Sequence, residues 1–408
     1  NEAHRIEAIQ PLKALESFEE ALATRPKLIL DGVFGIGLNR ALDADWIRLF
    51  TRINESGIPL LAIDTPSGLH SQTGEPMGAA LRATVTLMLG APKDGLLKAS
   101  ARPFVGRLEL ASNLGLIDCP FESPTRWTSA LDFRTFPPPR EPESHKGTYG
   151  RLAIVAGSIG YHGAAVLACR GAQRAQPGLI TLHSSSSAFP LAASQLQAVM
   201  ARPIQAAPEI DPDSSCVLVG PGLAGSDVPT SLPDWLARVW REESKVVVVD
   251  ASALDWIPEG PAPGERRVMT PHPGEAARLL GVSVQAVQSD RPAALRALSK
   301  KFGNCWVVLK GNLTLVGRSD GEIHVNPSGN PHLAQAGAGD LLAGWLSGLL
   351  AQPRLAGDPG QTIRYAVWKH GAVADDLQRH RPHWIIEDLA AWTEFPQEKP
   401  KLSFLPQE

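Results

Sequence analysis

A short run of small residues followed by an aspartate is the stretch of this chain best suited to chemistry. Gly337-Ala338-Gly339-Asp340 opens the apolar run 341–346. Glycines let a backbone turn approach a ligand closely, and a helix that begins there directs free N–H groups and the positive end of its dipole at an anion. An aspartate in such a place can take a proton beside a phosphate. Helix capping, which aspartate does well, is the alternative for Asp340.

Four other segments carry small or reactive residues where a strand is expected to end or a helix to begin. Taken singly, each has a simple structural explanation: a turn for the glycines, a pinned loop for His272, a first-turn carboxylate for Glu275 and a solvated strand end for Lys310. Together, glycines, one lysine, a hydroxyl and a carboxylate predict a nucleotide site with phosphoryl chemistry. The segments are Ala156-Gly157-Ser158, Gly220-Pro221-Gly222, Thr270-Pro271-His272-Pro273-Gly274-Glu275 and Lys310-Gly311-Asn312-Leu313-Thr314.

The elements that must position these residues alternate between strands and helices. Nearly every predicted strand ends in Gly, Asp or Lys. Open α/β sheets bind ligands at the carboxyl ends of their strands, so we expect the segments above to meet at one edge of a parallel sheet. The predicted strands are 151–155, 179–182, 216–219, 245–249 and 306–309, and the predicted helices are 163–175, 274–280, 292–301, 340–351 and 361–377.

The amino-terminal part of the chain shows the same alternation of strands and helices over fewer residues. Short buried strands are predicted at 28–30, 59–63 and 84–89, with a helix over 46–56. The proline-rich run 136–143 predicts a linker, because prolines stiffen a segment and remove hydrogen-bond donors. We therefore expect one domain over 1–130, a linker over 131–145 and a second domain over 146–395.

The composition describes an ordinary globular protein. With 408 residues the chain is longer than a single hydrophobic core usually accommodates, so we expect two or three domains. Apolar residues make up 43%, and a formal net charge of -3 gives no reason to expect nucleic acid or an anionic membrane as a partner. No run reaches the ~18 uncharged apolar residues of a membrane span. The scattered cysteines (Cys119, Cys169, Cys216 and Cys305) are expected to be buried, inert thiols in a reducing cytoplasm.

From Lys146 to about Leu350 the order of motifs resembles the ADP/ATP-dependent NAD(P)H-hydrate dehydratases, a branch of the ribokinase-like superfamily. The series is specific, and the Thr-Pro-His-Pro-Gly-Glu run separates this branch from sugar and vitamin kinases. The matching residues are 146–150, 156–158, 163–165, 220–222, 270–275, 310–311 with Thr314, and 329–331 leading to Gly339-Asp340.

The resemblance implies repair of a damaged cofactor, the hydrated nicotinamide ring of NADH or NADPH. Hydroxide is a poor leaving group, so a nucleotide's terminal phosphoryl is moved to the ring hydroxyl and phosphate is then eliminated. Asp340 would be the base on that hydroxyl, and Gly337 to Gly339 would cradle the phosphoryl oxygens. Lys310, Gly311, Asn312, Leu313, Thr314 and Gly339 would hold the nucleotide, and Ala164, Gly222, His272 and Asp340 would contact the hydrated cofactor. We expect ADP in preference to ATP, with Mg²⁺ on the phosphates.

The glycine loop departs from the family pattern at five positions, and two of these departures bear on ligand contacts. The family usually has Gly-Asn-Pro-Gly-Met-Ala-Thr-Gly-Gly-Thr-Gly-Asp, whereas this chain has Ala338 in place of a hydroxyl residue and His332 in place of a glycine. One side-chain hydrogen bond to phosphate would be lost while the backbone cradle remains. We expect activity to survive with an altered nucleotide affinity.

The amino-terminal half resembles the NAD(P)H-hydrate epimerase domain that is often fused ahead of the dehydratase. The resemblance rests on 31–38 and 62–69, and extends through 91–97 to about Leu116. It implies K⁺ at Asp31 and Ser67, and proton transfer by Asp64 as the epimers interconvert. Contacts to the hydrated cofactor would come from Asp64 and from Gly35, Ile36, Gly37, Leu38, Asn39, Arg40 and Ala41. Ordinary turns are the alternative for Gly35-Ile36-Gly37 and for Asp64.

One family motif is missing from this half. The Gly-x-Gly-Asn-Asn-Gly-Gly-Asp-Gly loop that should precede Asp31 is absent. Either the sequence is a fragment or this half has lost epimerase function; we favour a fragment, because the chain starts at Asn1 without methionine and the remaining motifs are intact.

The expected architecture is α/β throughout: an incomplete Rossmann-like three-layer αβα domain followed by a ribokinase-like α/β domain. The partners expected are small molecules, NAD(P)H hydrates and ADP, and the assembly a homo-oligomer. Two other functions remain open. One is a ribokinase-like kinase of a vitamin precursor such as a hydroxymethylpyrimidine, which leaves Thr270 to Glu275 unexplained; the other makes the amino-terminal half a non-catalytic binding module.

Overall fold

The computed structural model describes residues 15–112, 114–115 and 122–392, and the chain forms two compact units. The first unit covers Asn1–Phe121 and the second Glu122–Glu408. The division falls ahead of the expected linker, because the strand β5 (Thr125–Trp127) pairs with β14 (Ile323–Asn326) in the second unit. Cys119 and the expected domain end at residue 395 lie outside the described residues.

The expected linker is partly built into the second unit. Phe133 is buried, and its ring packs edge-on against Tyr365 at a centroid distance of 5.4 Å. Phe136 makes a similar contact at 5.1 Å with the same tyrosine, which lies on helix α12 (Pro359–His380). These aromatic contacts tie the start of the proline-rich run to the core of the second unit.

The first unit holds a four-stranded parallel sheet in the order β1-β2-β3-β4. Helix α2 begins after Asp43, whose carboxylate accepts from the backbone N–H groups of Asp45 and Trp46. It buries Phe50 and Ile53 against a core of the same unit. The elements are α1 (Leu15–Ala23), β1 (Ile29–Asp31), α2 (Ala44–Glu55), β2 (Leu60–Ile63), β3 (Val85–Leu89), α3 (Arg102–Val105) and β4 (Arg107–Ala111).

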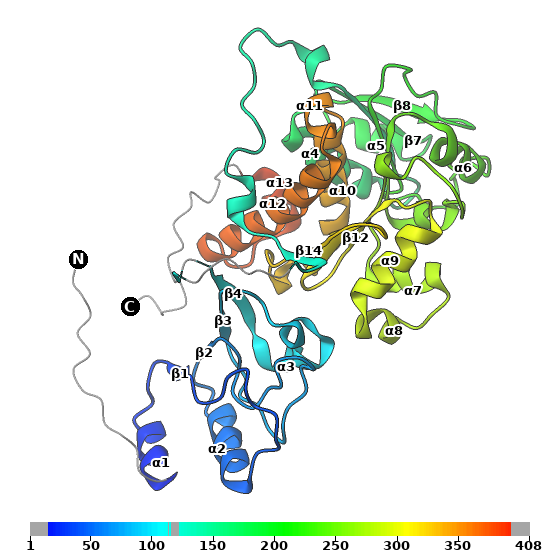
Figure 1. Ribbon diagram of the computed structural model, residues 1–408. Helices are drawn as coiled ribbons and strands as arrows, with labels where there is room; N and C mark the ends of the chain where they lie inside the picture. The colour runs from blue at the N-terminus through cyan, green and yellow to red at the C-terminus, as the bar shows by residue number, and fades with distance from the viewer. Residues whose placement is uncertain (1–14, 113, 116–121, 393–408) are drawn as a thin grey trace. The chain divides into compact units, whose positions relative to one another are not determined.

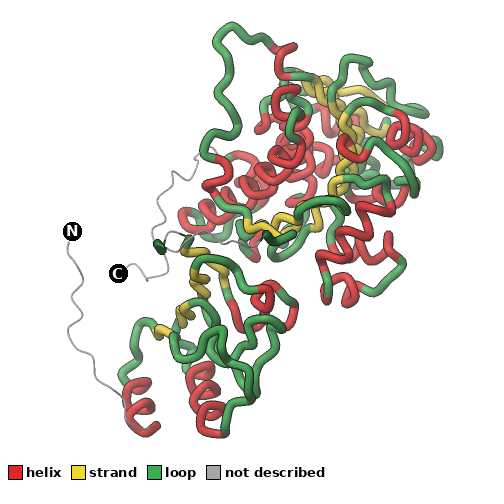
Figure 2. The backbone as a smooth tube through the Cα atoms, viewed as in Figure 1, coloured by secondary structure: helices red, strands yellow, loops and turns green. Residues whose placement is uncertain are grey.

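The second unit is built on a ten-stranded sheet that runs as one band through its middle (Figure 2). The spatial order is β5-β14-β13-β12-β11-β10-β9-β6-β7-β8. Strands from β12 to β8 are parallel, whereas β13 pairs antiparallel with β12 and β14. The bounds are β6 (Arg151–Val155), β7 (Leu179–Ser185), β8 (Met200–Ile204), β9 (Cys216–Val219), β10 (Val246–Val249), β11 (Arg267–Met269), β12 (Trp306–Leu309) and β13 (Thr314–Gly317).

Helices cover both faces of this sheet (Figure 1). Every residue of β9 and β10 is buried, but only alternate ones, such as Leu218 and Val248, join the core formed with α4 and α10. Successive strand residues point to opposite faces, so the others are covered from the far side. The helices are α4 (His162–Ala175), α5 (Phe189–Ala193), α6 (Leu232–Glu242), α7 (Pro273–Leu280), α8 (Val284–Ser289), α9 (Arg291–Lys301), α10 (Ala338–Leu350), α11 (Pro353–Ala356), α12 and α13 (Ile386–Ala391).

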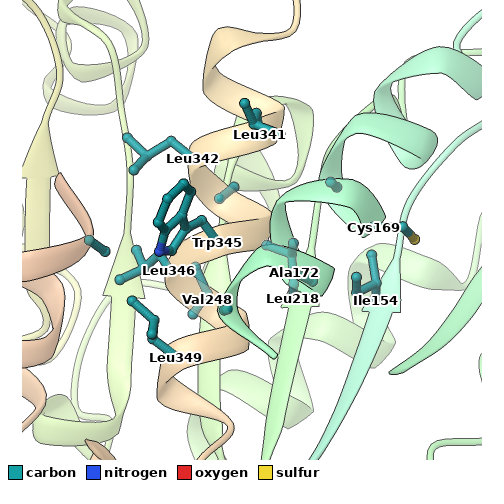
Figure 3. Close-up of a cluster of buried hydrophobic side chains, with 14 of the residues drawn as sticks. Ile154, Cys169, Ala172, Leu218, Val248, Leu341, Leu342, Trp345, Leu346 and Leu349 are labelled. Atoms are coloured by element: carbon teal, nitrogen blue, oxygen red, sulfur yellow. The ribbon is translucent and has the colours of Figure 1, made fainter. Parts of the chain in front are cut away.

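Helices α4 and α10 pack closely enough to exclude side chains larger than glycine at three positions. A Cβ added to Gly344 would lie 1.9 Å from the carbonyl oxygen of Ala168, and one added to Gly171 would lie 2.2 Å from that of Leu341. A Cβ added to Gly348 would lie 2.9 Å from the carbonyl oxygen of Ala172. From Gly344 to Gly348 on α10 the neighbouring residue on α4 advances from Ala168 to Ala172, so the two helices run parallel and begin at the same end. Figure 3 shows Trp345, Leu346 and Leu349 of α10 in the apolar layer that continues from this contact.

Candidate functional site

The carboxyl ends of the parallel strands collect the predicted segments at one edge of the second sheet. Gly220 follows β9, Asp250 follows β10, Thr270 follows β11 and Lys310 follows β12, and these four strands are consecutive neighbours. The loop after β6, the next strand, carries Gly157. This is the edge at which open α/β sheets bind ligands.

Asp340 lies in the first turn of α10, two residues inside the helix start. The capping alternative is wrong, because the N-cap residue is Gly337, in a left-handed conformation with φ 90°, and it makes no side-chain cap hydrogen bond. Burial, together with the charge of Asp250, raises the pKa of Asp340 to about 6. A carboxylate with such a pKa can accept a proton near neutral pH beside the anion-binding end of a helix.

Lys310 is not a solvated strand end. Its Nζ lies 2.9 Å from Oδ1 of Asp250, a carboxylate that is 2% exposed, and its own side chain is 19% exposed. Burial lowers the pKa of the Lys310 amine. The surrounding carboxylates, led by Asp250, raise it by more, so the net change is upward and the amine stays charged. A Cβ placed on Gly339 would lie 3.3 Å from Nζ, which puts this cation beside the glycine loop.

The segment after Lys310 is held in an unusual backbone conformation by a buried arginine. Gly311 has φ 128° and Leu313 has φ 55°. Arg291, at the start of α9, donates to the carbonyl oxygens of Leu309 at 2.9 Å and Lys310 at 3.2 Å, and also to that of Asn312. Three carbonyls fixed by one guanidinium give the loop a defined shape without a ligand.

His272 has the local structural role that a pinned residue suggests. Its Nδ1 accepts from the backbone N–H of Gly274 at 3.0 Å and of Glu275 at 3.3 Å, capping α7, while Glu275 Oε2 accepts from the His272 N–H at 2.7 Å. Because Nδ1 is an acceptor, Nε2 carries the ring proton. The side chain is 55% exposed, and its Nε2 lies 3.5 Å from Oε1 of Glu275. The Lys310 N–H donates to Pro271 O at 2.9 Å, which joins this loop to the lysine segment.

Ala164 and Gly222 lie together where the loop after β9 meets the start of α4. A Cβ on Gly222 would lie 2.9 Å from Cβ of Ala164 and 2.6 Å from the carbonyl oxygen of Tyr161. Ser158 Oγ donates to Gly222 O at 2.6 Å and accepts from the Gly225 N–H at 2.7 Å. The glycine therefore permits close contact between the loop after β9 and the start of α4, and φ 67° adds a second requirement for glycine.

Helix α12 supports the loop that leads into Gly337. Asp375 is buried, and its carboxylate accepts from the Gly329 N–H at 2.9 Å and from Asn330 Nδ2 at 3.1 Å. His370 is also buried, and burial lowers its pKa to about 4, so it is neutral at pH 7. His332, the residue in place of the family's glycine, is exposed in the short turn Pro331–Leu333.

Four residues of the site region were missed by sequence reasoning: Asp250, Arg291, Asp375 and His370. Asp250 follows four valines and belongs to the pattern of strands ending in Gly, Asp or Lys, so the pattern could have identified it. The other three lie on helices, and their roles depend on which loop each helix touches.

In the first unit, Asp31 and Ser67 lie together as expected. Ser67 donates to the Asp31 carboxylate through its N–H at 2.7 Å and through Oγ at 2.5 Å. Burial raises the pKa of Asp31, against the opposing effect of these hydrogen bonds. Asp64 has φ 71°, accepts from the Leu89 N–H at 2.9 Å and forms an ion pair with Lys93.

The loop of the first unit that was expected to contact a ligand divides into two classes. Leu38 is buried in the core of the unit, which is the simpler explanation for its apolar side chain. The other residues from Gly35 to Ala41 are exposed, and a Cβ on Gly35 or Gly37 would meet nothing within 4 Å. The structure leaves space around these glycines.

The described residues show neither a metal-binding cluster nor a membrane-spanning helix. Within 15–112, 114–115 and 122–392 there is no group of three or more His, Cys, Asp or Glu side chains arranged to hold a metal ion. No helix in the same part of the chain combines the length and the apolar character needed to cross a membrane. Cys169, Cys216 and Cys305 are buried free thiols, as expected.

Comparison with known proteins accounts for both units. A family model described as NAD(P)H-hydrate dehydratase matches residues 152–391, and one described as YjeF-related protein N-terminus matches residues 3–95. The bifunctional NAD(P)H-hydrate repair enzyme Nnr of Coxiella burnetii is 35% identical over 364 residues, covering 88% of this chain and 73% of that protein. The enzyme of the same name from Escherichia coli is 34% identical over 364 residues, covering 86% and 67%.

Solved structures confirm the expected fold of the second unit. The ADP/ATP-dependent NAD(P)H-hydrate dehydratase of Bacillus subtilis, co-crystallised with ATP and Mg²⁺, matches with a TM-score of 0.55 at 30% identity, covering 62% of this chain and 91% of that one. A ribokinase-like superfamily protein from Enterococcus faecalis matches in fold, with a TM-score of 0.56 at 22% identity over 67% and 96% of the two chains. The chain therefore belongs to the bifunctional NAD(P)H-hydrate repair enzymes, with an epimerase-type amino-terminal domain followed by a ribokinase-like dehydratase domain.

Proposed function

We propose that the second unit dehydrates the S epimer of hydrated NADH or NADPH with ADP as phosphoryl donor. The observation that carries the proposal is the meeting of Asp340, Lys310 and the glycine loop at the start of α10. A carboxylate whose pKa lies at about 6, a half-buried lysine and a helix start without a side-chain cap supply the base, the cation and the anion site that phosphoryl transfer needs.

The chemistry divides into a transfer and an elimination. Asp340 removes the proton of the ring hydroxyl as its oxygen attacks the terminal phosphorus of ADP, and AMP leaves. The phosphoryl oxygens lie against the backbone of the glycine loop Gly337 to Gly339, with Lys310 beside them. The ring carbon–oxygen bond then breaks, phosphate departs with the bonding pair, and loss of a proton from the neighbouring carbon forms the ring double bond.

The remaining expected contacts divide into residues that hold the nucleotide and residues that contact the hydrated cofactor. Residues Lys310 to Thr314 and Gly339 hold the nucleotide, and Ala164, Gly222 and His272 contact the hydrated cofactor. His272 presents Nε2–H as a donor, since its Nδ1 is occupied by the helix cap. Ala338 is buried at the start of α10 and offers no hydroxyl to the phosphates.

Magnesium fits this site as an ion carried by the nucleotide. The described residues form no three-ligand metal cluster, and the Asp250 carboxylate already accepts from Lys310 and Thr270. Mg²⁺ commonly keeps several waters and takes its other ligands from phosphates, where it neutralises charge.

For the first unit we propose epimerisation of the R and S hydrates, with Asp64 in proton transfer and the loop Gly35–Ala41 against the cofactor. Asp31 and Ser67 fit a K⁺ site, because a buried carboxylate whose pKa burial raises is stabilised by a nearby cation. Lys93 forms an ion pair with Asp64 and places a cation beside that carboxylate. We also propose a cytoplasmic homo-oligomer.

The test is recovery of NADH absorbance from hydrated NADH with ADP or ATP as the sole nucleotide. We expect NADH and free phosphate, with ADP the better donor. A stable phosphoester without NADH would instead indicate the kinase alternative. Supplying the pure R hydrate tests the first unit: slow or absent conversion, beside rapid conversion of the S hydrate, would contradict epimerase activity in this chain.

A further inference from the structure

Asp250 is the most deeply buried carboxylate beside the glycine loop, and no role has yet been given to it. It is 2% exposed at the end of β10. Its Oδ1 accepts from Lys310 Nζ at 2.9 Å and from Thr270 Oγ1 at 2.6 Å. A buried carboxylate with a charged partner and a hydroxyl donor is satisfied in the folded state, so it needs no ligand of its own.

The backbone around Asp250 fixes the carboxylate tightly. Its N–H donates to Val219 O at 3.0 Å, and the next residue, Ala251, has φ 52°, a conformation that L residues rarely adopt. A Cβ on Gly220 would lie 1.8 Å from Asp250 O, so the neighbouring strand end has room only for glycine. A backbone held in place by several such constraints is typical of residues whose position matters for a site.

The second oxygen of Asp250 faces the glycine loop. A Cβ placed on Gly339 would lie 3.9 Å from Asp250 Oδ2 and 3.3 Å from Lys310 Nζ. The ion pair therefore lies directly under the residue that precedes Asp340, and both of its charges act on the Asp340 carboxylate.

We propose that Asp250 is a positioning residue of the dehydratase site: it anchors the Lys310 amine under the glycine loop and keeps Asp340 a competent base. This inference deepens the proposed function and rests on it. The Asp250 anchor holds the lysine where the transferred phosphoryl is cradled, and Thr270 orients the anchor. The carboxylate acts through these protein contacts, to Lys310 and Thr270.

The charged neighbours of Asp340 give the anchor a measurable signature. Asp250 and Glu275 of α7 raise its pKa, whereas Lys310 lowers it. His370 of α12 is neutral at pH 7, since burial lowers its pKa to about 4. Removing the Asp250 charge should therefore lower the pKa of Asp340, and removing the Lys310 charge should raise it.

The test uses Asp250→Asn, which keeps the side-chain shape and removes the charge. We expect the dissociation constant and the KM for ADP to rise about tenfold, the loss typical of one misplaced charge-assisted hydrogen bond. Asp340, followed by carboxyl NMR titration without substrate, should titrate at lower pH than in the unaltered chain. Asp255→Asn is the matched control, because Asp255 forms an exposed ion pair with Arg278 at 2.8 Å.

A double-mutant cycle separates anchoring from general damage. In a Lys310→Ala background the ADP affinity should be weak already, and adding Asp250→Asn should change it little. Equal losses in both backgrounds would overturn the anchor, as would normal ADP binding together with an unmoved Asp340 titration. These binding and NMR readouts do not need turnover, so a chain that binds ADP but does not restore NADH would count against the proposed function alone.

A variant that removes both buried charges covers the case in which Asp250→Asn does not fold. Asp250→Asn with Lys310→Met removes both charges of the ion pair, so neither partner is left buried opposite a neutral one. Asp340 should titrate at lower pH in this double variant than in Lys310→Met alone. An identical titration in the two would overturn the inference.

Discussion

Asp340→Asn is expected to abolish turnover while making the second unit more stable at neutral and alkaline pH. The substitution removes the proposed base, so kcat should fall by orders of magnitude with ADP binding retained. It also removes a carboxylate that the fold holds against its preference for ionisation, since burial and Asp250 raise its pKa to about 6.

The size of the stability change follows from that shift. An aspartate that moves from 3.8 to about 6 on folding costs the folded state about 3 kcal/mol once pH exceeds both values, at roughly 1.4 kcal/mol per unit. Because the folded pKa is raised, the folded state binds the proton more tightly, and its stability falls as pH rises from 3.8 through 6. The neutral asparagine escapes this loss, so its advantage should be full at pH 8, about half at pH 5 and small at pH 4.

Urea unfolding of the two proteins at these three pH values measures the effect, and initial rates with hydrated NADH and ADP measure turnover. In the unaltered chain, kcat should fall on the acid side with an apparent pKa near that of Asp340. Equal stability of the two proteins at pH 8 would contradict a raised pKa at this position. Near-normal turnover of Asp340→Asn would refute its role as base.

Two further substitutions separate structural from functional roles. His272→Asn keeps an acceptor for the α7 cap and lacks the Nε2 donor, so it should raise the KM for hydrated NADH with little change in stability, whereas His272→Ala should also lose about 1 kcal/mol of stability; a normal KM in the asparagine variant would leave His272 a cap only. Gly344→Ala should destabilise the second unit by about 2 kcal/mol or more in urea unfolding, because its Cβ would lie 1.9 Å from Ala168 O. Gly163→Ala on α4, where a Cβ meets nothing within 4 Å, is the control, and equal stability of the two variants would contradict the close helix contact.

Local residue types were enough to predict much of this molecule. The predicted strands 151–155, 216–219 and 306–309 match β6, β9 and β12, because runs of branched apolar residues bounded by polar ones suit a buried parallel strand. Helix limits were within a few residues, with α10 beginning at Ala338 rather than Asp340. The short strands β4, β5, β8, β11, β13 and β14 were not predicted, since their pairing partners, not their own sequences, make them strands.

By itself, the sequence determined the alternation of strands and helices, the family and the residue types that can hold nucleotide and move a proton. Tertiary structure decided the burial, the charge state and the neighbours of those residues. A solvated strand end was still an alternative for Lys310 until β10 placed Asp250 2.9 Å from its amine, and a helix cap was still an alternative for Asp340 until the helix began at Gly337–Ala338. Charge state and burial depend on neighbours from other strands and helices, and distances between such neighbours are set only when the sheet and its helices pack together.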